Sequence, residues 1–198
     1  GPVCVEMGTT HERNLLKYFS ARGVKVRIVI VDSAEGAAQA LFAGKCSAYS
    51  SDASQLAALR LKAPGGAAAY RILPERISKE PLGPVVLDDD LGWASVVRWV
   101  LYVLIEAEER GITRATADTA VPLAISRGAS DARARTDWDY TQRELGLRPD
   151  WAAQAVRAVG NYGEMFERNV GANSPLRLER GLNRLWTQGG LMYAPPLN

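Results

Sequence analysis

Histidine and cysteine are scarce in this chain of 198 residues, which has one histidine, His11, and two cysteines, Cys4 and Cys46. A structural zinc site takes a full set of Cys and His ligands, and this chain supplies too few. A catalytic triad would have to use His11 as its base, and no Gly-x-Ser-x-Gly turn is present to carry a nucleophile. We therefore expect no metal, no cofactor and no enzymatic activity.

The sequence also lacks an excess of one charge and any long apolar run. Its 24 Lys and Arg residues and 22 Asp and Glu residues are mixed along the chain, for a net charge of +2. Without a basic stripe to hold a polyanion, nucleic acid is not expected as a partner. The most apolar stretch, Val96–Ile105, falls short of the roughly 20 apolar residues of a transmembrane helix. The first residues show no basic and then apolar pattern of a signal peptide.

Hydrophobic residues make up 47% of the chain, which is enough to bury a substantial core. In the first third, strand-like and helical segments alternate, with Gly44 ending the second helix. The expected strands are Val3–Glu6, Val26–Val31 and Ser47–Ser50, and the expected helices are 11–21, 33–43 and 53–61. This alternation predicts an α/β domain with a mainly parallel sheet over residues 1–88, closed by a strand-like segment at Pro84–Leu87.

Beyond Asp88–Asp90 the apolar residues recur at helical spacing, which predicts an all-helical portion over residues 89–198. The expected helices are Leu91–Arg110, Asp131–Leu145, Asp150–Val159, Tyr162–Asn169 and Leu176–Thr187. Gly160–Glu164 is interpreted as a turn between helices, because it lacks the lysine and the preceding strand of a phosphate-binding loop. These amphipathic helices have no obvious sheet to cover, so their apolar faces need another partner.

The two cysteines lie in or just before strands that can be neighbours in one sheet. A disulfide between Cys4 and Cys46 would close a loop of about 40 residues and restrict the unfolded chain by at most roughly 4 kcal/mol. Two buried thiols fit the same spacing. The residues alone leave both alternatives open.

Polar segments follow the first and third expected strands. Gly8-Thr9-Thr10 brings two hydroxyls to the start of a helix, where free backbone amides favour an anion such as a carboxylate. Asp52 occupies the equivalent end of the third strand and can bind a cationic amine. The pair suits a zwitterion such as a free α-amino acid, with His11 beside it. Both segments can also be ordinary helix caps.

Several motifs follow one another in the order of one protein family. They are Val3-Cys4-Val5-Glu6-Met7-Gly8-Thr9-Thr10, Gly44 to Asp52, Ile77 to Pro84, Ala107 to Thr113, Val159 to Glu164, Ser174-Pro175-Leu176 and Tyr193 to Pro196. In these motifs the chain resembles the second lobe and C-terminal portion of the periplasmic polar-amino-acid-binding proteins of bacterial ABC importers, which have a type II fold. The resemblance covers nearly the whole chain.

The resemblance implies a ligand site. In the family, a hydroxyl pair helps to hold the α-carboxylate of the ligand and an acid binds its α-ammonium, and Thr9, Thr10 and Asp52 match these positions. Gly8 and His11 complete the predicted ligand-binding set, although His11 departs from the Thr or Gln often found there. The disulfide of the family matches Cys4 and Cys46 and suits the oxidising periplasm.

The family also implies partners and a further lobe. Its members carry a free L-amino acid to the membrane subunits of the importer. A preceding first lobe supplies an arginine for the ligand carboxylate and an aromatic residue that covers the ligand. No segment of these 198 residues matches that lobe, so we expect a half-site of weak affinity. The alternative is a truncated module that binds no ligand and forms a homo-oligomer through its exposed helix faces.

Overall fold

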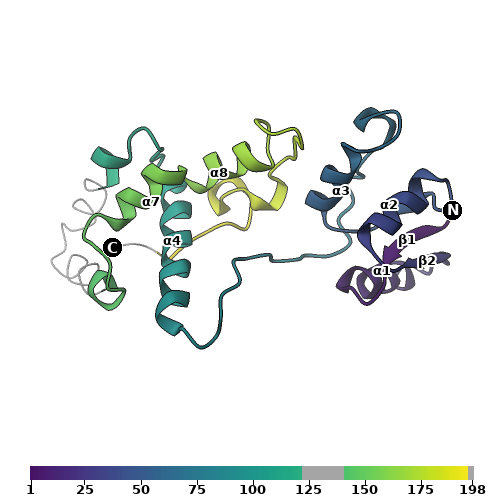
Figure 1. Cartoon of the computed structure of the whole chain (residues 1–198), viewed down its shortest axis with the longest axis horizontal. Helices are drawn as coiled ribbons and strands as arrows, with labels where there is room; N and C mark the ends of the chain where they lie inside the picture. The colour runs from purple at the N-terminus through teal and green to yellow at the C-terminus, as the bar shows by residue number, and fades with distance from the viewer. Residues whose placement is uncertain (122–140, 196–198) are drawn as a thin grey trace. The chain divides into compact units, whose positions relative to one another are not determined.

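The computed structural model describes residues 1–121 and 141–195, which form two compact units, Gly1–Leu82 and Gly83–Asn198 (Figure 1). The break falls a few residues before residue 88, where the sequence changes character. Each unit has its own hydrophobic core. Within the described ranges, no helix combines the length and the apolar character needed to cross a membrane.

The first unit is a small parallel sheet with helices. Its strands, in the spatial order β2-β1-β3, are β1 (Val3–Glu6), β2 (Ile28–Val31) and β3 (Ala48–Tyr49). Its α-helices, which follow the strands in turn, are α1 (Thr10–Ser20), α2 (Ala34–Phe42) and α3 (Ala53–Arg60). Both outer strands pair with β1 in parallel, so that Cys4 lies opposite Val29 on one side and Tyr49 on the other. The predicted α/β class is confirmed.

Helices α1 and α2 lie on opposite sides of the strands, with α2 above and α1 below β1 in Figure 1. The connection from β1 to β2 runs in one direction across the sheet, and the connection from β2 to β3 runs past β1 in the opposite direction. Because both crossovers are right-handed, the two helices lie on opposite faces of the sheet. The small core under α2 contains Cys4, Ala37, Ala40 and Cys46. Cys4 and Cys46 form a disulfide, with their Cα atoms 5.7 Å apart, which confirms the bridge implied by the family resemblance.

Side-chain caps and a glycine explain where two of the helices begin and end. The Ser33 hydroxyl accepts a hydrogen bond from the Gly36 amide at 3.1 Å and starts α2. This helix ends just before Gly44, whose φ of +72° is strained for residues with a side chain. Asp90 starts the long helix of the second unit by accepting from the Trp93 amide at 2.8 Å. These bounds agree with the sequence because capping is a local property.

The segment Pro84–Leu87 is not the closing strand that its composition suggested. The sheet of the first unit contains only β1, β2 and β3 among the described residues, and this segment belongs to the second unit. Its Val85 side chain is 95% exposed. Pro84 cannot donate to a strand ladder, and an apolar β-branched run becomes a strand only where a neighbouring edge accepts its hydrogen bonds.

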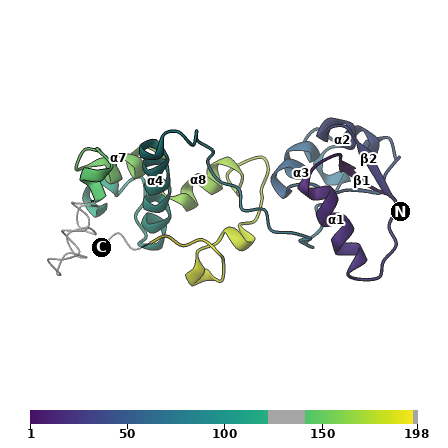
Figure 2. The ribbon, with the colours of Figure 1, turned by 90° about the horizontal axis from the view of Figure 1, so that it is seen from below.

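The second unit is built from helices that pack on one another (Figure 2). Its α-helices with described bounds are α4 (Leu91–Glu109), α7 (Trp151–Val159) and α8 (Tyr162–Asn169). Both α7 and α8 pack against α4. The core residues are Val103, Leu104, Ala107, Ile112, Ala117, Val121, Trp151, Ala152, Ala153 and Val156. The helices therefore supply a partner for much of their own apolar surface, although Trp93 and Trp186 stay more than half exposed.

The predicted helix Leu176–Thr187 is wrong. The chain there forms two short 3-10 turns, η2 (Gly181–Asn183) and η3 (Trp186–Gln188), and Leu185 makes an isolated β-bridge with Met192. Arg177 has a φ of +48° and Gly181 a φ of +51°, and neither value fits a right-handed helix. Most of the predicted helix Asp131–Leu145 lies outside the described residues.

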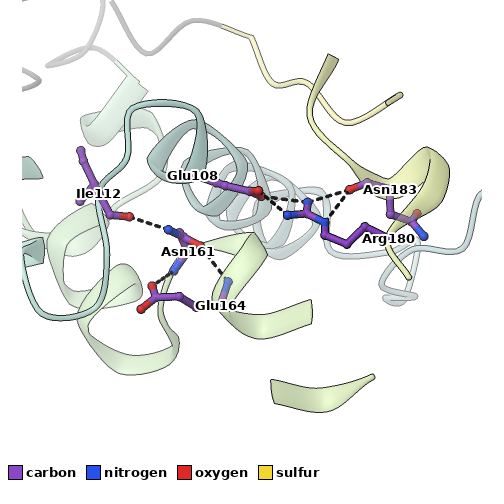
Figure 3. Close-up of polar contacts among 6 residues, drawn as sticks. All are labelled: Glu108, Ile112, Asn161, Glu164, Arg180 and Asn183. Carbon is purple, nitrogen blue, oxygen red and sulfur yellow. Dashed lines mark hydrogen bonds and ion pairs between the residues drawn. The ribbon is translucent and has the colours of Figure 1, made fainter. Parts of the chain in front are cut away.

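A cluster of polar side chains joins α4 to the turn η2 (Figure 3). Arg180 forms a bidentate ion pair with Glu108, and each side chain of the pair is 12% exposed. The Arg180 Nη2 also donates to the Asn183 carbonyl oxygen at 2.7 Å. A Cβ atom at Gly163 would approach the Glu108 carboxylate to 2.9 Å. The absence of a side chain at Gly163 therefore makes room for this ion pair.

The chain turns between α7 and α8 at Gly160 and Asn161, whereas the rest of the predicted turn Gly160–Glu164 is already the start of α8. Asn161 Oδ1 accepts from the Glu164 amide at 2.9 Å, and the Glu164 carboxylate accepts from the Asn161 amide at 2.9 Å, which is a capping box. The Asn161 Nδ2 donates to the Ile112 carbonyl oxygen at 2.8 Å. These groups are already bonded within the protein, so the turn is a structural joint.

Candidate functional site

The carboxyl ends of β1 and β3 form a topological switch point. The chain leaves β1 toward β2 on one side, whereas β3 lies on the other side of β1. The loops after two such strands diverge, and ligands in open parallel sheets bind in the crevice between them. The Ser50 amide donates to the Cys4 carbonyl oxygen at 3.0 Å, which keeps the two strand ends in register. The segments Gly8–Thr10 and Ser50–Asp52 therefore start from the same edge of the sheet.

Thr9 and Thr10 have different environments, although both are threonines at the start of α1. The Thr9 hydroxyl donates to the Glu6 carbonyl oxygen at 2.7 Å and accepts from the Glu12 amide at 3.4 Å, so it is the N-cap. No hydrogen bond among the described residues engages the Thr10 hydroxyl or the amides of Thr9 and Thr10. The unused donors for an anion are therefore at Thr10 and in the backbone.

Gly8 makes the turn between β1 and α1 with a φ of +73°, which favours glycine. Its amide donates to the Glu12 carboxylate at 3.0 Å. Sequence reasoning missed Glu12, although Thr9-x-x-Glu12 matches the Ser/Thr-x-x-Glu pattern of a capping box. The protein thus places one carboxylate of its own against this loop, and that carboxylate occupies the Gly8 amide.

Asp52 stands at the N-cap position of α3, but its side chain makes no capping hydrogen bond. Its Oδ2 lies 3.7 Å from His11 Nε2, and the two side chains are 29% and 15% exposed, respectively. This distance is too long for a direct hydrogen bond, so the contact is electrostatic when the imidazole is protonated. The contact brings the starts of α1 and α3 together, as the sequence predicted for the two segments.

Tyr49 is a further polar group of this edge that sequence reasoning missed. Its hydroxyl is buried and has no hydrogen-bond partner by geometry among the described residues. Burial raises the pKa of Tyr49; the nearby Ser51 hydroxyl opposes the shift, and the carboxylates of Glu6 and Asp52 add to it. The position of Tyr49 as the last residue of β3 was the signal that could have found it.

The motif Ile77 to Pro84 has a contact of its own with α1. Glu80 Oε1 accepts from the Asn14 side chain at 2.7 Å and from the Ser78 hydroxyl at 3.1 Å. These bonds hold part of the motif against the helix that begins at Thr10. Across the described ranges, no group of three or more His, Cys, Asp and Glu side chains is placed to hold a metal ion.

No family model matches the chain, but individual known proteins are similar to it. It is 47% identical to the glutamate/glutamine/aspartate/asparagine-binding protein BztA of Rhodobacter capsulatus and 44% identical to the general L-amino acid-binding periplasmic protein AapJ of Rhizobium johnstonii. It is 43% identical to the putative amino-acid ABC transporter-binding protein YhdW of Escherichia coli. Each match covers 98% of this chain.

A solved structure shows the same fold. It is an ABC transporter/periplasmic binding protein from Brucella ovis with glutathione bound, with a TM-score of 0.81 and 41% identity over 100% of this chain. The chain spans 56–57% of the length of the relatives above and 61% of this structure. In sequence and in fold, the chain is similar to a part of the amino-acid-binding and periplasmic binding proteins of ABC transporters.

Proposed function

We propose that this chain supplies amino-acid-binding residues to an ABC-type amino-acid import system of the periplasm. The first unit binds the α-carboxylate and the α-ammonium of a free L-amino acid at the carboxyl edge of its sheet. Gly8, Thr9 and Thr10 form the carboxylate side, and Asp52, with His11 beside it, forms the ammonium side. The activity is capture and delivery of a ligand to the membrane subunits, with no chemical conversion.

The observation that carries this proposal is the state of the Asp52 carboxylate. It occupies a cap position without capping the helix, and it is 29% exposed opposite the start of α1. A carboxylate held in this way can accept charge-assisted hydrogen bonds from an ammonium group, which are about twice as strong as neutral ones. The spare donors at Thr10 lie next to His11 in the chain, and His11 contacts Asp52. Acceptor and donors therefore lie within one small site.

The three residues of the carboxylate side have separate roles. Gly8 turns the chain so that the amides of the loop and the first turn face one region, and Thr9 holds that turn by its bond to Glu6. Thr10 contributes a hydroxyl that makes no other described hydrogen bond. A ligand carboxylate is also favoured by the dipole of α1 at this end.

The ligands of the relatives fit a site for the α-groups. The relatives are named for glutamate, glutamine, aspartate, asparagine and general L-amino acids, which share an α-carboxylate and an α-ammonium. Glutathione, present in the structural neighbour, also retains both α-groups on its γ-linked glutamate. The periplasm is consistent with the Cys4–Cys46 disulfide, because disulfides persist in oxidising compartments.

The test is calorimetric titration of the chain with L-glutamine, L-glutamate and glutathione. We expect binding that Asp52→Asn weakens by about 10- to 100-fold, since a hydrogen bond to a charged group contributes about 1.5–3 kcal/mol. Asp32→Asn is the matched control, because Asp32 is an exposed acid directly after β2 at the same sheet edge. Equal effects of the two substitutions, or no binding of any of the three compounds, would refute the proposal.

Self-association does not form part of this proposal. At the level of sequence, the amphipathic helix faces left without a partner favoured it. Light scattering over a range of concentrations, run beside the titration, measures the mass directly and separates an assembly module from a binding component.

A further inference from the structure

The contact between His11 and Asp52 joins the two sides of the candidate site. His11 is the second residue of α1 and Asp52 precedes α3, and their side chains are 15% and 29% exposed, respectively. Histidine is the side chain that ordinarily changes charge between pH 5 and 8. The carboxylate assigned to the ligand ammonium therefore already has a neighbour in the protein that becomes a cation in mild acid.

We propose that His11 is a proton-controlled competitor for the ligand ammonium at Asp52. This inference rests on the proposed function and adds regulation of the same site. The protonated imidazole pairs with Asp52 in the free protein and holds the place of the ammonium group. Binding of an amino acid displaces it, and His11 gives up its proton to solvent because its counter-charge has been taken.

The geometry suits displacement. The separation of 3.7 Å is an ion pair without a direct hydrogen bond, whereas a ligand ammonium can donate directly to the carboxylate. Among the ion pairs of the described residues, Asp52 joins His11 alone. When the imidazole is neutral, no other cation of the described residues pairs with Asp52, and its carboxylate is open to the ligand.

The other titratable groups of this region do not take over the role of His11. Glu6, at the end of β1, and Asp52 both act on the partly buried Tyr49 of β3. Burial raises the pKa of Tyr49, so this phenol stays neutral in mild acid. Glu12, on the same helix as His11, accepts from the Gly8 amide. The imidazole is the group here that ordinarily gains positive charge between pH 8 and 5.

The sign of the pH dependence follows from proton release. Binding sheds a proton from His11 where the imidazole is charged in the free protein, so lower pH opposes binding and higher pH favours it. Affinity reaches a plateau where the imidazole is neutral, and it falls by up to about tenfold per pH unit where the imidazole of the free protein is charged. An amino acid with a neutral side chain keeps both α-groups charged across this range.

The first experiment titrates the full chain with L-glutamine at about pH 8 and about pH 5.5. Two buffers with different ionisation enthalpies give the number of protons released. We expect weaker binding at the lower pH with release of up to one proton, and His11→Gln should lose both the pH dependence and the release. Binding that is equally strong at both pH values in the wild type overturns the competition and leaves the proposed function standing. Absence of binding at both pH values overturns the competition and the proposed function together.

A second measurement needs no ligand. Because the chain has a single histidine, its imidazole signals can be followed by NMR without overlap from any other histidine. At about pH 5.5, Asp52→Asn should shift these signals, while the control Asp32→Asn should leave them unchanged. Identical imidazole signals in Asp52→Asn and wild type would show that the two side chains do not interact, which overturns the inference independently of any binding result.

Discussion

Each unit contains a partly or largely buried pair of opposite charge. The pair is Glu108 and Arg180 in the second unit and Asp52 and His11 in the first, and the two pairs differ in what else their atoms contact. Arg180 makes two bonds to Glu108, further bonds to the Asn183 carbonyl oxygen, and approaches the rings of Tyr162 and Phe166. Asp52 makes no cap bond and lies 3.7 Å from its partner. Saturated polar groups hold a fold together, whereas polar groups with spare bonding capacity can bind a ligand.

The largest effect should come from Arg180→Met, which leaves the Glu108 carboxylate without its counter-charge. Because both side chains are 12% exposed, we expect a loss near the lower end of the usual range, about 3 kcal/mol in the free energy of unfolding of the second unit. All five tryptophans lie beyond Leu82, so tryptophan fluorescence during denaturation reports this unit. Arg148→Met breaks an exposed pair with Asp150 and should cause no measurable change. Equal losses of unfolding free energy in Arg180→Met and Arg148→Met would show that the Arg180 pair contributes no more to the fold than an exposed pair.

Removal of the disulfide should have the next largest effect, in the first unit. The bridge joins residues 42 positions apart, so the double substitution Cys4→Ala and Cys46→Ala should destabilise this unit by roughly 2–4 kcal/mol. Hydrogen exchange of the β1 amides measures the loss, and reduction of the wild type should reproduce it. A simultaneous change in the tryptophan transition would show that the two units do not unfold independently.

The neighbouring threonines sharpen the comparison within one helix turn. Thr9→Ala removes the cap of α1 and should cost about 1 kcal/mol. Thr10→Ala removes a hydroxyl without a described hydrogen bond and should change stability by less than about 0.5 kcal/mol. Hydrogen exchange of the α1 amides distinguishes the two. If Thr10→Ala proved the more destabilising, its hydroxyl would have a structural role and not a free one.

An equally small effect on stability should come from Asp52→Asn. The carboxylate caps no helix and its ion pair is partly exposed, so the free energy of unfolding should change by less than about 0.5 kcal/mol at neutral pH. The same substitution is expected to weaken amino-acid binding strongly. Thermal unfolding and calorimetry on one preparation check both statements, and a large loss of stability would assign Asp52 to the fold.

Local features were predictable from the sequence. The starts of α2 and α4 follow from Ser33 and Asp90, the end of α2 from Gly44, and the turn between α7 and α8 from Gly160 and its neighbours. In each case the deciding contacts lie within a few residues along the chain. The same reasoning failed for Leu176–Thr187, where Leu185 is buried through contacts that its helical spacing does not describe.

The candidate site was predictable only in part. Sequence placed Thr9, Thr10 and Asp52 at one sheet edge, because parallel strands end at the same side. It left undecided which threonine is the cap, and whether Asp52 is one. Those answers depend on what each side chain contacts in the folded chain. Thr9 is hydrogen-bonded to the Glu6 carbonyl oxygen and the Glu12 amide, whereas Asp52 makes no cap bond and lies 3.7 Å from His11.

By itself, the sequence determined the alternation of strands and helices and the caps of the helices. Through its motifs it also indicated the family resemblance, whereas it left open whether the two cysteines form a disulfide. The tertiary structure decided that Arg180 pairs with Glu108, 72 positions away, that Pro84–Leu87 joins no sheet, and that His11 faces Asp52. Periodicity and capping arise from neighbours along the chain. Pairing between distant residues depends on which surfaces the folded chain brings together, and no local pattern encodes that.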